Sequence, residues 1–467
     1  MQSGQHGYRV AVVGSGPAAF YSAEALLKSG IEGVQVDLFD RLPVPFGLVR
    51  GGVAPDHQKI KSVVKVYDKI AACPGFRFFG NVRLGRDVSV QDLEAHYHHV
   101  VYAFGCESDS KLGVPGEELA GVYAATDFVG WYNGHPDHRG HVFDLANARR
   151  VALVGNGNVA MDVARILLAS PDELQKTDIA EHTLPVLRSS KVEEVILLGR
   201  RGPAQAAFSP KEIEEIAELA DVDVVVSEQD AALDELSAKW LEADGARSQQ
   251  RNVDFLQTRA ALGEGDRPKK LRCRFLVAPE ALLGTDKLTG VRIQHMQLVA
   301  DQSGTPRPKA TGTSEELAVD LLFKAIGYRG EPVEGVPFDD RKGIVANLDG
   351  RVVEAPGHKP SNDVRVGHYA AGWCKRGPTG LIGTNSLDAK DTVKAMVADF
   401  ADGKTLQPSA TDVTALLGSR GVDFVTWADW QRLDAWELKE GEARGKLRHK
   451  LASVDELMRV VRELRPA

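Results

Sequence analysis

The sequence predicts an α/β protein with two doubly wound parallel sheets. Strand-like apolar runs alternate with helical stretches along most of the 467 residues, which is typical of parallel sheets covered by helices. A unit of strand, glycine-rich turn and helix occurs at residues 8–29 and again at residues 150–169. A chain of this length is also too long for one ordinary core. We therefore expect two doubly wound domains, each built around one copy of the unit.

The first unit begins with the apolar strand Tyr8–Val13, followed by the turn Gly14-Ser15-Gly16-Pro17-Ala18-Ala19 and a helix that ends near Lys28. This is the G-x-G-x-x-A pattern in the strand–turn–helix setting that a dinucleotide site requires. Gly14 permits the tight turn, Gly16 lets the backbone approach a pyrophosphate, and Ala19 allows close packing of helix on strand. The free N–H groups at the start of the helix then stabilise the phosphate charge.

An acid ends the next strand of the first unit. The strand Val34–Phe39 runs into Asp40, at the position where an acid accepts hydrogen bonds from an adenosine ribose. A carboxylate there repels a 2′-phosphate. The first unit should therefore hold FAD or NAD and not NADP.

The second unit carries arginines where the first carries its acid. The strand Arg150–Val154 leads into Gly155-Asn156-Gly157-Asn158-Val159-Ala160 and a helix over Met161–Ala169, and the strand Val195–Leu198 runs into Gly199-Arg200-Arg201. Guanidinium groups bind phosphate bidentately, so this pair is suited to the 2′-phosphate of NADP(H). An arginine pair that is merely solvated is the alternative. This difference in charge assigns FAD to the first unit and NADP(H) to the second.

The overall composition limits the remaining functions. Hydrophobic residues make up 43% and charged residues 26%, as in soluble globular proteins, and a formal net charge of −8 gives no support for nucleic acid as a partner. No apolar run reaches the ~18 residues of a membrane span. The polar segment Met1–Tyr8 has no features of a signal or transit peptide, so a cytoplasmic location is expected. The four cysteines are too far apart for a C-x-x-C motif and indicate reduced thiols: Cys73, Cys106, Cys273 and Cys374.

Several longer motifs carry a family resemblance. They are Pro43-Val44-Pro45-Phe46-Gly47-Leu48-Val49-Arg50, Gly52-Val53-Ala54-Pro55-Asp56-His57, Phe128-Val129-Gly130-Trp131-Tyr132-Asn133, Gly199–Pro203 with Phe208, and Gly372–Asn385. The chain resembles adrenodoxin reductase and its bacterial relatives, the adrenodoxin-reductase-type ferredoxin–NADP reductases. The resemblance runs from the first strand to the region of Asp429–Leu451. It implies a bacterial enzyme that passes electrons from NADPH through FAD to an acidic, ferredoxin-type iron–sulfur protein.

The resemblance also implies a domain organisation. Residues 1–108 and 329–467 would form the FAD-binding domain, and residues 109–328 an NADP-binding domain inserted in it, both of Rossmann-like fold. The C-terminal region after residue 404 should be helical, with Trp427, Trp430, Leu433 and Trp436 on one packing face. The polar stretches Ala231–Lys270 and Ala300–Glu316 look like insertions or flexible loops.

Site residues follow from the same resemblance, position by position. FAD contacts are expected at Gly14, Ser15, Gly16, Pro17, Ala18, Asp40, Leu48, Val82, Trp373, Gly380, Leu381 and Ile382, with Gly380 also on the nicotinamide side of NADP. NADP contacts are expected at Asn156, Gly157, Asn158, Val159, Arg200 and Arg201. His57 and Glu212 match polar residues beside the nicotinamide and flavin and are the candidates for catalytic roles. No metal is expected. From the residues alone, a structural histidine is the alternative for His57, and a solvated residue in the first turn of a helix is the alternative for Glu212.

Two departures from the family pattern concern the partner. Gln58 replaces a proline after His57, and Glu214 stands where relatives carry an arginine of the partner-docking region. An acidic partner needs a basic face on this acidic chain. Two groups are candidates, although ordinary solvated faces are the alternative: Lys59, Lys61, Lys65 and Lys69, and then Lys269, Lys270, Arg272 and Arg274.

Four rival functions are compared with this interpretation. A pyridine nucleotide–disulfide reductase needs a cysteine pair beside the flavin, and these cysteines are isolated. A flavin monooxygenase of the Baeyer–Villiger type carries F-x-G-x-x-x-H, whereas Phe128, Gly130 and His135 have one residue too many in between. A diaphorase or an NADPH-sensing module would use the same nucleotide sites without a ferredoxin.

Overall fold

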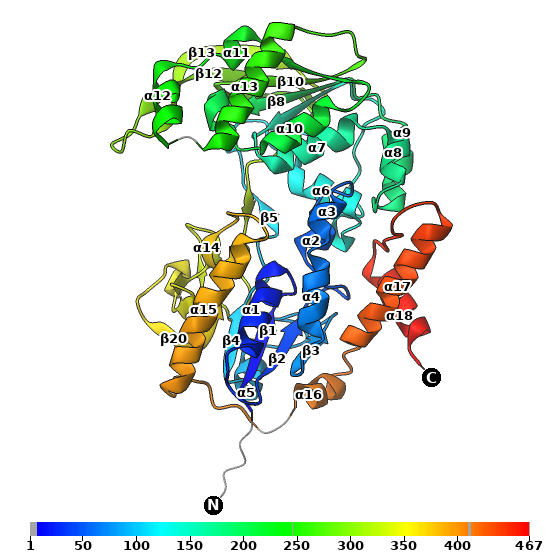
Figure 1. Ribbon diagram of the computed structural model, residues 1–467, viewed down its shortest axis with the longest axis vertical. Coiled ribbons are helices and arrows are strands. Elements are labelled where there is room, and N and C mark those ends of the chain that lie inside the picture. Colours follow the sequence, from blue (N-terminus) through cyan, green and yellow to red (C-terminus); the bar gives the residue numbers. More distant parts are fainter. Residues whose placement is uncertain (1–6, 245, 410–411, 467) are drawn as a thin grey trace, which may run out of the picture. The chain divides into compact units, whose positions relative to one another are not determined.

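The computed structural model describes residues 7–244, 246–409 and 412–466, so part of the polar N-terminal segment lies outside the described residues. The chain divides into two compact units (Figure 1). Unit 1 comprises Met1–Ser108, Asn133–Asp137 and Tyr328–Ala467, and unit 2 comprises Asp109–Tyr132 and His138–Gly327. The chain of unit 2 therefore interrupts that of unit 1.

A seven-stranded sheet forms the centre of unit 1, in the order β18-β19-β20-β4-β1-β2-β3. The five strands from β20 to β3 are parallel, and the other two are antiparallel. Their bounds are β1 (Arg9–Val13), β2 (Gln35–Phe39), β3 (Phe76–Phe79), β4 (His99–Tyr102), β18 (Asn347–Leu348), β19 (Arg351–Val353) and β20 (Val364–Ala370). All four residues of β4 are buried, as expected for a central strand covered on both faces.

Polar side chains inside this sheet have partners. His99 contacts the Tyr8 hydroxyl through Nδ1 at 2.6 Å and the Lys404 carbonyl through Nε2 at 3.1 Å. Burial lowers the pKa of His99 to about 4, so the imidazole is neutral. These contacts satisfy a histidine that the apolar pattern of the strand does not explain.

The helices of unit 1 cover both faces of the sheet. They are α1 (Pro17–Leu27), α2 (Leu48–Gly51), α3 (Gln58–Lys61), α4 (Val64–Ala71), α5 (Val90–His96), α14 (Trp373–Arg376), α15 (Thr384–Ala401), α16 (Val413–Ser419), α17 (Trp427–Ala443) and α18 (Val454–Leu464). α1 and α15 pack along each other (Figure 1). The predicted packing face of α17 is confirmed, because Trp430 and Leu433 are buried in the core and Trp427 and Trp436 pack against it. The rings of Phe20 and Phe46 meet Trp427 and Trp430 there.

Unit 2 holds a second parallel sheet of six strands, in the order β6-β14-β7-β8-β10-β9. Its strands are β6 (Val122–Ala124), β7 (Arg150–Val154), β8 (Glu194–Gly199), β9 (Val222–Val226), β10 (Lys269–Phe275) and β14 (Leu321–Lys324). An antiparallel sheet joins β11 (Val277–Gly284), β12 (Leu288–Ala300) and β13 (Pro306–Ala318). The helices are α6 (Ala125–Asn133), α7 (Asn158–Leu168), α8 (Pro171–Gln175), α9 (Leu184–Arg188), α10 (Pro210–Ala217), α11 (Glu228–Ala231), α12 (Glu235–Asp244) and α13 (Arg247–Leu262).

Short elements complete the chain. The strands β5 (Ser108–Asp109) and β15 (Tyr328–Arg329) lie where the chain crosses from one unit to the other, and β16 (Phe338–Asp339) pairs with β17 (Ile344–Val345). Four 3-10 turns lie at Pro136–His138, Glu181–Thr183, Pro203–Gln205 and Pro356–His358. Within the described ranges, no helix combines the length and apolar character needed to cross a bilayer.

Two sequence predictions are wrong. The stretch Ala231–Lys270 contains α12 and α13 and is not a flexible loop. α13 buries Asn252, Val253 and Leu256, while its other faces remain polar. The stretch Ala300–Glu316 falls largely in β13, which pairs with β12 along almost its whole length. Its side chains are mostly exposed, so the alternation that marks a half-buried strand is missing.

A buried carboxylate fixes the C-terminal helices of unit 1. Glu437 of α17 has no exposed side-chain surface, and both guanidinium nitrogens of Arg50 donate to it at 2.6 and 2.8 Å. Arg448 donates at 3.0 Å and the Leu451 N–H at 3.2 Å. Burial alone would raise the pKa of Glu437, but the two guanidinium groups hold it below its usual range.

We predict that Glu437→Gln lowers the free energy of unfolding by about 3–5 kcal/mol, since removing one partner leaves buried charge uncompensated. Denaturant unfolding followed by tryptophan fluorescence measures this loss. A carboxylate whose folded pKa is depressed stabilises the protein above its unfolded pKa of about 4.3, and this contribution is lost as pH falls through the folded value. The difference between the two proteins should therefore shrink in acid.

Glu440→Gln is the matched control on the same helix. Glu440 forms an exposed pair with Arg444 at 2.6 Å, and such pairs contribute only about 0–1 kcal/mol. Equal losses in both variants would contradict the role assigned to Glu437.

Candidate functional site

The first glycine turn is shaped by the neighbouring strand connection. Gly14 has φ +114°, and a Cβ there would lie 2.4 Å from the Ala103 carbonyl oxygen. A Cβ on Gly16 would meet no atom within 4 Å, so this face of the turn is open. The Ser15 carbonyl accepts the Phe46 N–H at 2.9 Å, which holds the following loop against the turn. The open face at the start of α1 has the shape that a pyrophosphate requires.

Asp40 lies beside this turn, at the end of β2. Its carboxylate accepts hydrogen bonds from the Ser15 hydroxyl and from the Leu42 N–H, the latter at 2.8 Å. Burial raises the pKa of Asp40, while these two hydrogen bonds act in the opposite direction. The Asp40 carbonyl accepts the Val82 N–H at 2.8 Å. The structure thus brings Asp40 and Val82 together with Gly14, Ser15 and Gly16.

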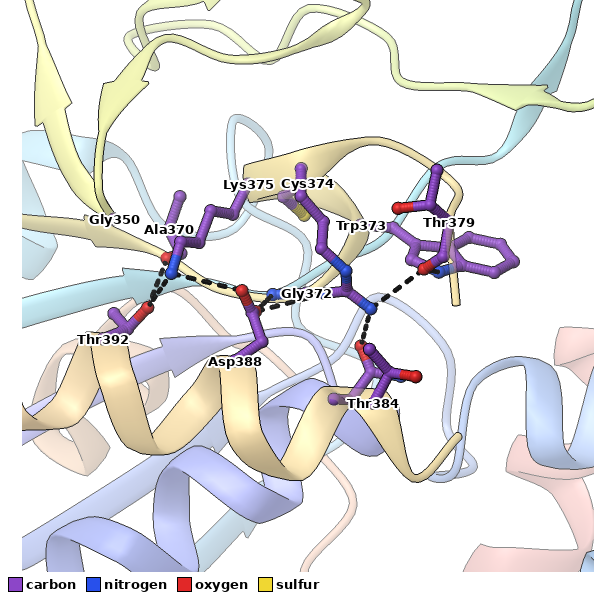
Figure 2. A network of polar contacts seen from close by, with 12 residues as sticks. Gly350, Ala370, Gly372, Trp373, Cys374, Lys375, Thr379, Thr384, Asp388 and Thr392 are labelled. Carbon is purple, nitrogen blue, oxygen red and sulfur yellow. Dashed lines mark hydrogen bonds and ion pairs between the residues drawn. The ribbon is translucent and has the colours of Figure 1, made fainter. Parts of the chain in front are cut away.

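The segment that follows β20 reaches the same region of unit 1. A Cβ on Gly372 would lie only 2.4 Å from the Ala18 side chain, so glycine is required for this close approach. Asp388 of α15 accepts the Gly372 N–H at 2.5 Å and lies 3.2 Å from both Lys375 Nζ and the Arg376 guanidinium. Figure 2 shows Gly372 and Lys375 converging on Asp388, with Trp373 and Thr379 at the other end of the network. One carboxylate on a long helix therefore holds the first part of the predicted flavin-side loop, from Gly372 to Arg376.

The remaining predicted residues of this loop are less buried. The Trp373 indole donates to the Thr379 carbonyl at 3.2 Å, and the Leu381 N–H donates to the Thr384 hydroxyl at 3.2 Å. Gly380 has φ +79°, Ile382 is partly buried, and the Leu381 side chain is 72% exposed. Leu48, at the start of α2, is half-buried. Their place in a ligand site stays a prediction.

The second glycine turn repeats the first in unit 2. Gly155 has φ +118°, and a Cβ there would lie 2.3 Å from the Ala325 carbonyl oxygen. A Cβ on Gly157 would meet no atom within 4 Å. The Asn156 carbonyl accepts the Ala207 N–H at 3.0 Å, and Asn158 Oδ1 accepts the Ser209 N–H at 2.8 Å. Asn158 and Val159 begin α7, so all four predicted NADP contacts of the turn lie at one helix start.

The arginines after β8 form an electropositive group. Neither Arg200 nor Arg201 makes an ion pair with any described residue, and Arg200 is exposed. Burial, followed by the like charges of Arg200 and Arg307, lowers the pKa of Arg201. Arg307 of β13 is itself paired with Asp301 at 2.8 Å. Uncompensated guanidinium groups at a strand end are well suited to an anion such as the 2′-phosphate of NADP.

The two candidates for catalytic roles belong to different units and are described separately. His57 of unit 1 precedes α3 and is 8% exposed. Glu212 of unit 2 lies in the first turn of α10 and is 6% exposed, so the alternative of a solvated residue does not hold. Glu212 accepts a hydrogen bond from Arg165 of α7 at 3.0 Å. Arg165, also buried, reaches Asp162 at 2.6 Å.

Sequence reasoning missed three residues that shape these sites: Asp388, Arg165 and Arg307. Arg165 occupies an apolar face of α7, and a charged residue on such a face is a signal that could have been followed. Asp388 lies three residues past the Gly372–Asn385 motif, without a recognisable spacing. Arg307 was missed because the stretch Ala300–Glu316, which contains it, was predicted to be an insertion or flexible loop.

The comparisons with known proteins agree with this geometry. Residues 8–228 match the family model "Pyridine nucleotide-disulphide oxidoreductase". NADPH-ferredoxin reductase FprA of Mycobacterium tuberculosis is 44% identical over 464 residues, covering 97% of this chain and 99% of that protein. The mitochondrial NADPH:adrenodoxin oxidoreductase of Salvelinus fontinalis is 42% identical, covering 97% and 91%. The solved structure of M. tuberculosis FprA in complex with NADPH aligns with a TM-score of 0.90 at 43% identity, covering 98% of this chain and all of that one.

The chain belongs to the adrenodoxin-reductase-type ferredoxin–NADP reductases. Membership confirms the predicted resemblance and the α/β fold with two Rossmann-like sheets. It also separates the chain from the disulfide reductases that share its family model. All four cysteines are unpaired, and burial raises the pKa of Cys106 to about 12 and that of Cys374 well above its usual value. Such thiols are unreactive.

The two candidate basic groups differ in how far their charges are paired within the chain. In the second group, Lys270 and Arg272 pair with Glu264, Arg274 pairs with Glu315, and Lys269 donates to the Leu168 carbonyl. In the first group, Lys61 is buried and donates to Asn133 at 3.4 Å. Lys59, Lys65 and Lys69 are exposed, and their role as a docking face stays a prediction.

We predict that the double variant Arg200→Ala, Arg201→Ala raises KM for NADPH at least about tenfold and leaves KM for NADH nearly unchanged. Each charge-assisted hydrogen bond to phosphate contributes ~1.5–3 kcal/mol. Steady-state reduction of a dye with each nucleotide gives both values. The control removes two exposed arginines of unit 2 that pair with Glu193 and Glu316: Arg149→Ala, Arg292→Ala. If KM rises equally for NADPH and NADH in the Arg200→Ala, Arg201→Ala variant, these two arginines do not bind the 2′-phosphate.

We predict that Asp388→Asn weakens FAD binding about tenfold or more, because the loop from Gly372 to Arg376 loses its anionic anchor. Titration of the apoprotein with FAD measures the affinity. Asp391→Asn, an exposed position on the same helix, is the control. Retention of FAD at wild-type affinity in Asp388→Asn would contradict the positioning role.

Proposed function

We propose that this protein is a ferredoxin–NADP reductase that passes electrons from NADPH through FAD to a ferredoxin-type iron–sulfur protein. The observation that carries the proposal is the opposite charge at two equivalent strand ends. Asp40 ends β2 in one glycine-turn unit, and the unpaired Arg200 and Arg201 follow β8 in the other. Relatives that are more than 40% identical over nearly the whole chain are named for this activity.

The residues of unit 1 fit FAD. The Gly14–Ala19 turn and the start of α1 hold the pyrophosphate, Asp40 accepts from the ribose hydroxyls, and Gly372 allows the approach of the loop on the flavin side. Leu48, Val82, Trp373 and Gly380–Ile382 complete this proposed site. A bound flavin accepts two electrons as a hydride and can release them one at a time. Residues 1–108 and 329–467 are accordingly proposed as the FAD-binding domain.

The residues of unit 2 fit NADP(H), which is the electron donor. Asn156–Val159 and the start of α7 hold the pyrophosphate, and Arg200 and Arg201 bind the 2′-phosphate. Glu212 is held by Arg165 and is proposed as a polar residue beside the nicotinamide. For His57 of unit 1 we propose the corresponding role beside the flavin. Residues 109–328 are accordingly proposed as the NADP-binding domain.

The electron acceptor should be acidic, because the exposed lysines 59, 65 and 69 form the basic face of unit 1. Glu214 of unit 2 is not a free negative charge, since Arg251 donates to it at 2.7 Å.

We also propose a cytoplasmic location. The four unpaired cysteines support it, since reduced thiols are typical of that compartment.

The proposal is tested with the purified yellow protein in a stopped-flow spectrometer. NADPH should bleach the flavin absorbance, and an acidic ferredoxin should then restore it. Turnover with ferredoxin should slow as salt is added, because exposed charges are screened within ~8–10 Å at physiological ionic strength. Reduction of a small neutral dye should depend on salt much less. If the reduced flavin passes electrons to the dye and not to ferredoxin, the protein is a diaphorase. Oxygenation of an organic substrate would instead indicate a monooxygenase.

We further predict that Glu214→Arg speeds ferredoxin reduction at low salt and leaves flavin reduction by NADPH unchanged. The substitution removes an ion pair with Arg251 and adds positive charge at the position where the family resemblance implies an arginine. Glu235→Arg, at an exposed position of α12 in the same unit, makes the same change of charge elsewhere. Equal acceleration by both variants would contradict a local docking role for residue 214.

A further inference from the structure

A cluster of two histidines and one aspartate lies on unit 2, and none of the three residues is assigned to a nucleotide. Asp127 belongs to the first turn of α6, His138 ends the 3-10 turn that follows, and His141 comes three residues later. One oxygen of Asp127 lies 3.3 Å from His138 Nδ1 and 3.5 Å from His141 Nε2. The two ring nitrogens are 3.4 Å apart. Three donor atoms therefore form a nearly equilateral triangle.

The size of this triangle is that of a metal site. A tetrahedral Zn²⁺ centre has bonds of about 2.0–2.1 Å, which places neighbouring ligand atoms about 3.3–3.4 Å apart. Imidazole and carboxylate are ligands that divalent transition metals accept. The side chains of Asp127, His138 and His141 are 28%, 21% and 36% exposed, so the fourth position faces solvent.

The backbone around the cluster fixes two of the three ligands. A Cβ on Gly130 of α6 would lie 2.2 Å from His138 Cδ2, so the imidazole packs directly on the helix backbone and any other residue would displace it. Asp127 accepts a hydrogen bond from the Ala124 backbone, which orients its carboxylate. Such outer contacts hold metal ligands in position.

We propose that Asp127, His138 and His141 form a binding site for a divalent transition metal such as Zn²⁺, with a fourth position open to water. The metal would join the first turn of α6 to the segment that follows the helix. Because it binds only the folded arrangement, it would stabilise unit 2.

The test is calorimetric titration of the chelator-treated, FAD-loaded protein with Zn²⁺. His141→Ala removes a ligand without disturbing the contact of His138 with Gly130, and Asp127→Asn removes the anionic ligand while keeping its shape. His295→Ala is the matched control, because His295 is a half-exposed histidine with a single acidic neighbour, Glu315, at 3.5 Å. We expect the wild type and His295→Ala to bind one zinc ion that the other two variants bind at least about tenfold more weakly.

Thermal melting gives a second measurement that does not depend on the stoichiometry of weak surface sites. Zinc should raise the melting temperature of the wild type and of His295→Ala, and not that of His141→Ala, whereas the four metal-free proteins should melt alike. The proposal is overturned if the wild type binds no zinc, if His141→Ala and Asp127→Asn bind it as the wild type does, or if His295→Ala loses it equally.

Discussion

Both sheets of this protein depend on a glycine that is pressed against the backbone of a neighbouring strand connection. Gly14 faces the carbonyl of Ala103, and Gly155 faces that of Ala325, each at a distance that leaves no room for a side chain. The positive φ at both positions turns the chain sharply from strand into helix. The starts of α1 and α7 therefore lie at the carboxyl edge of their sheets, where the next strand also delivers its last residue.

That last residue gives each unit its chemistry. The same architecture presents a carboxylate after β2 and two guanidinium groups after β8, so the two sheets differ in the nucleotide they suit although their backbones are alike. The supporting contacts differ as well. Asp40 is held by local hydrogen bonds within unit 1, whereas Arg200 and Arg201 keep their charge uncompensated next to Arg307. In the proposed NADP site these cations need no partner within the protein, because the 2′-phosphate would supply the counter-charge.

The sequence predicts correctly those features whose residues lie close together along the chain. The glycine turns, Asp40 and the arginine pair each lie within a few residues of a strand end, so their positions follow from the strand–turn–helix pattern. Asp388 and Arg165 could not be placed in this way, because their partners are reached only after α15 and α7 have packed on their sheets. The helix α13 was missed for a different reason. Its buried stripe is narrow, and the glycines and charges that follow it dominate the composition of the region.

The interrupted chain of unit 1 has a consequence for synthesis. β20 pairs with β4 in the middle of the sheet, with His368 beside Val100, so the sheet lacks a central neighbour until the ribosome has passed residue 370. Unit 2 is complete by Gly327. Domains fold as they emerge, and pairing between strands distant in sequence is slow. Unit 2 should thus be folded while β4 still presents an open edge, and the nascent chain needs protection from aggregation during that interval.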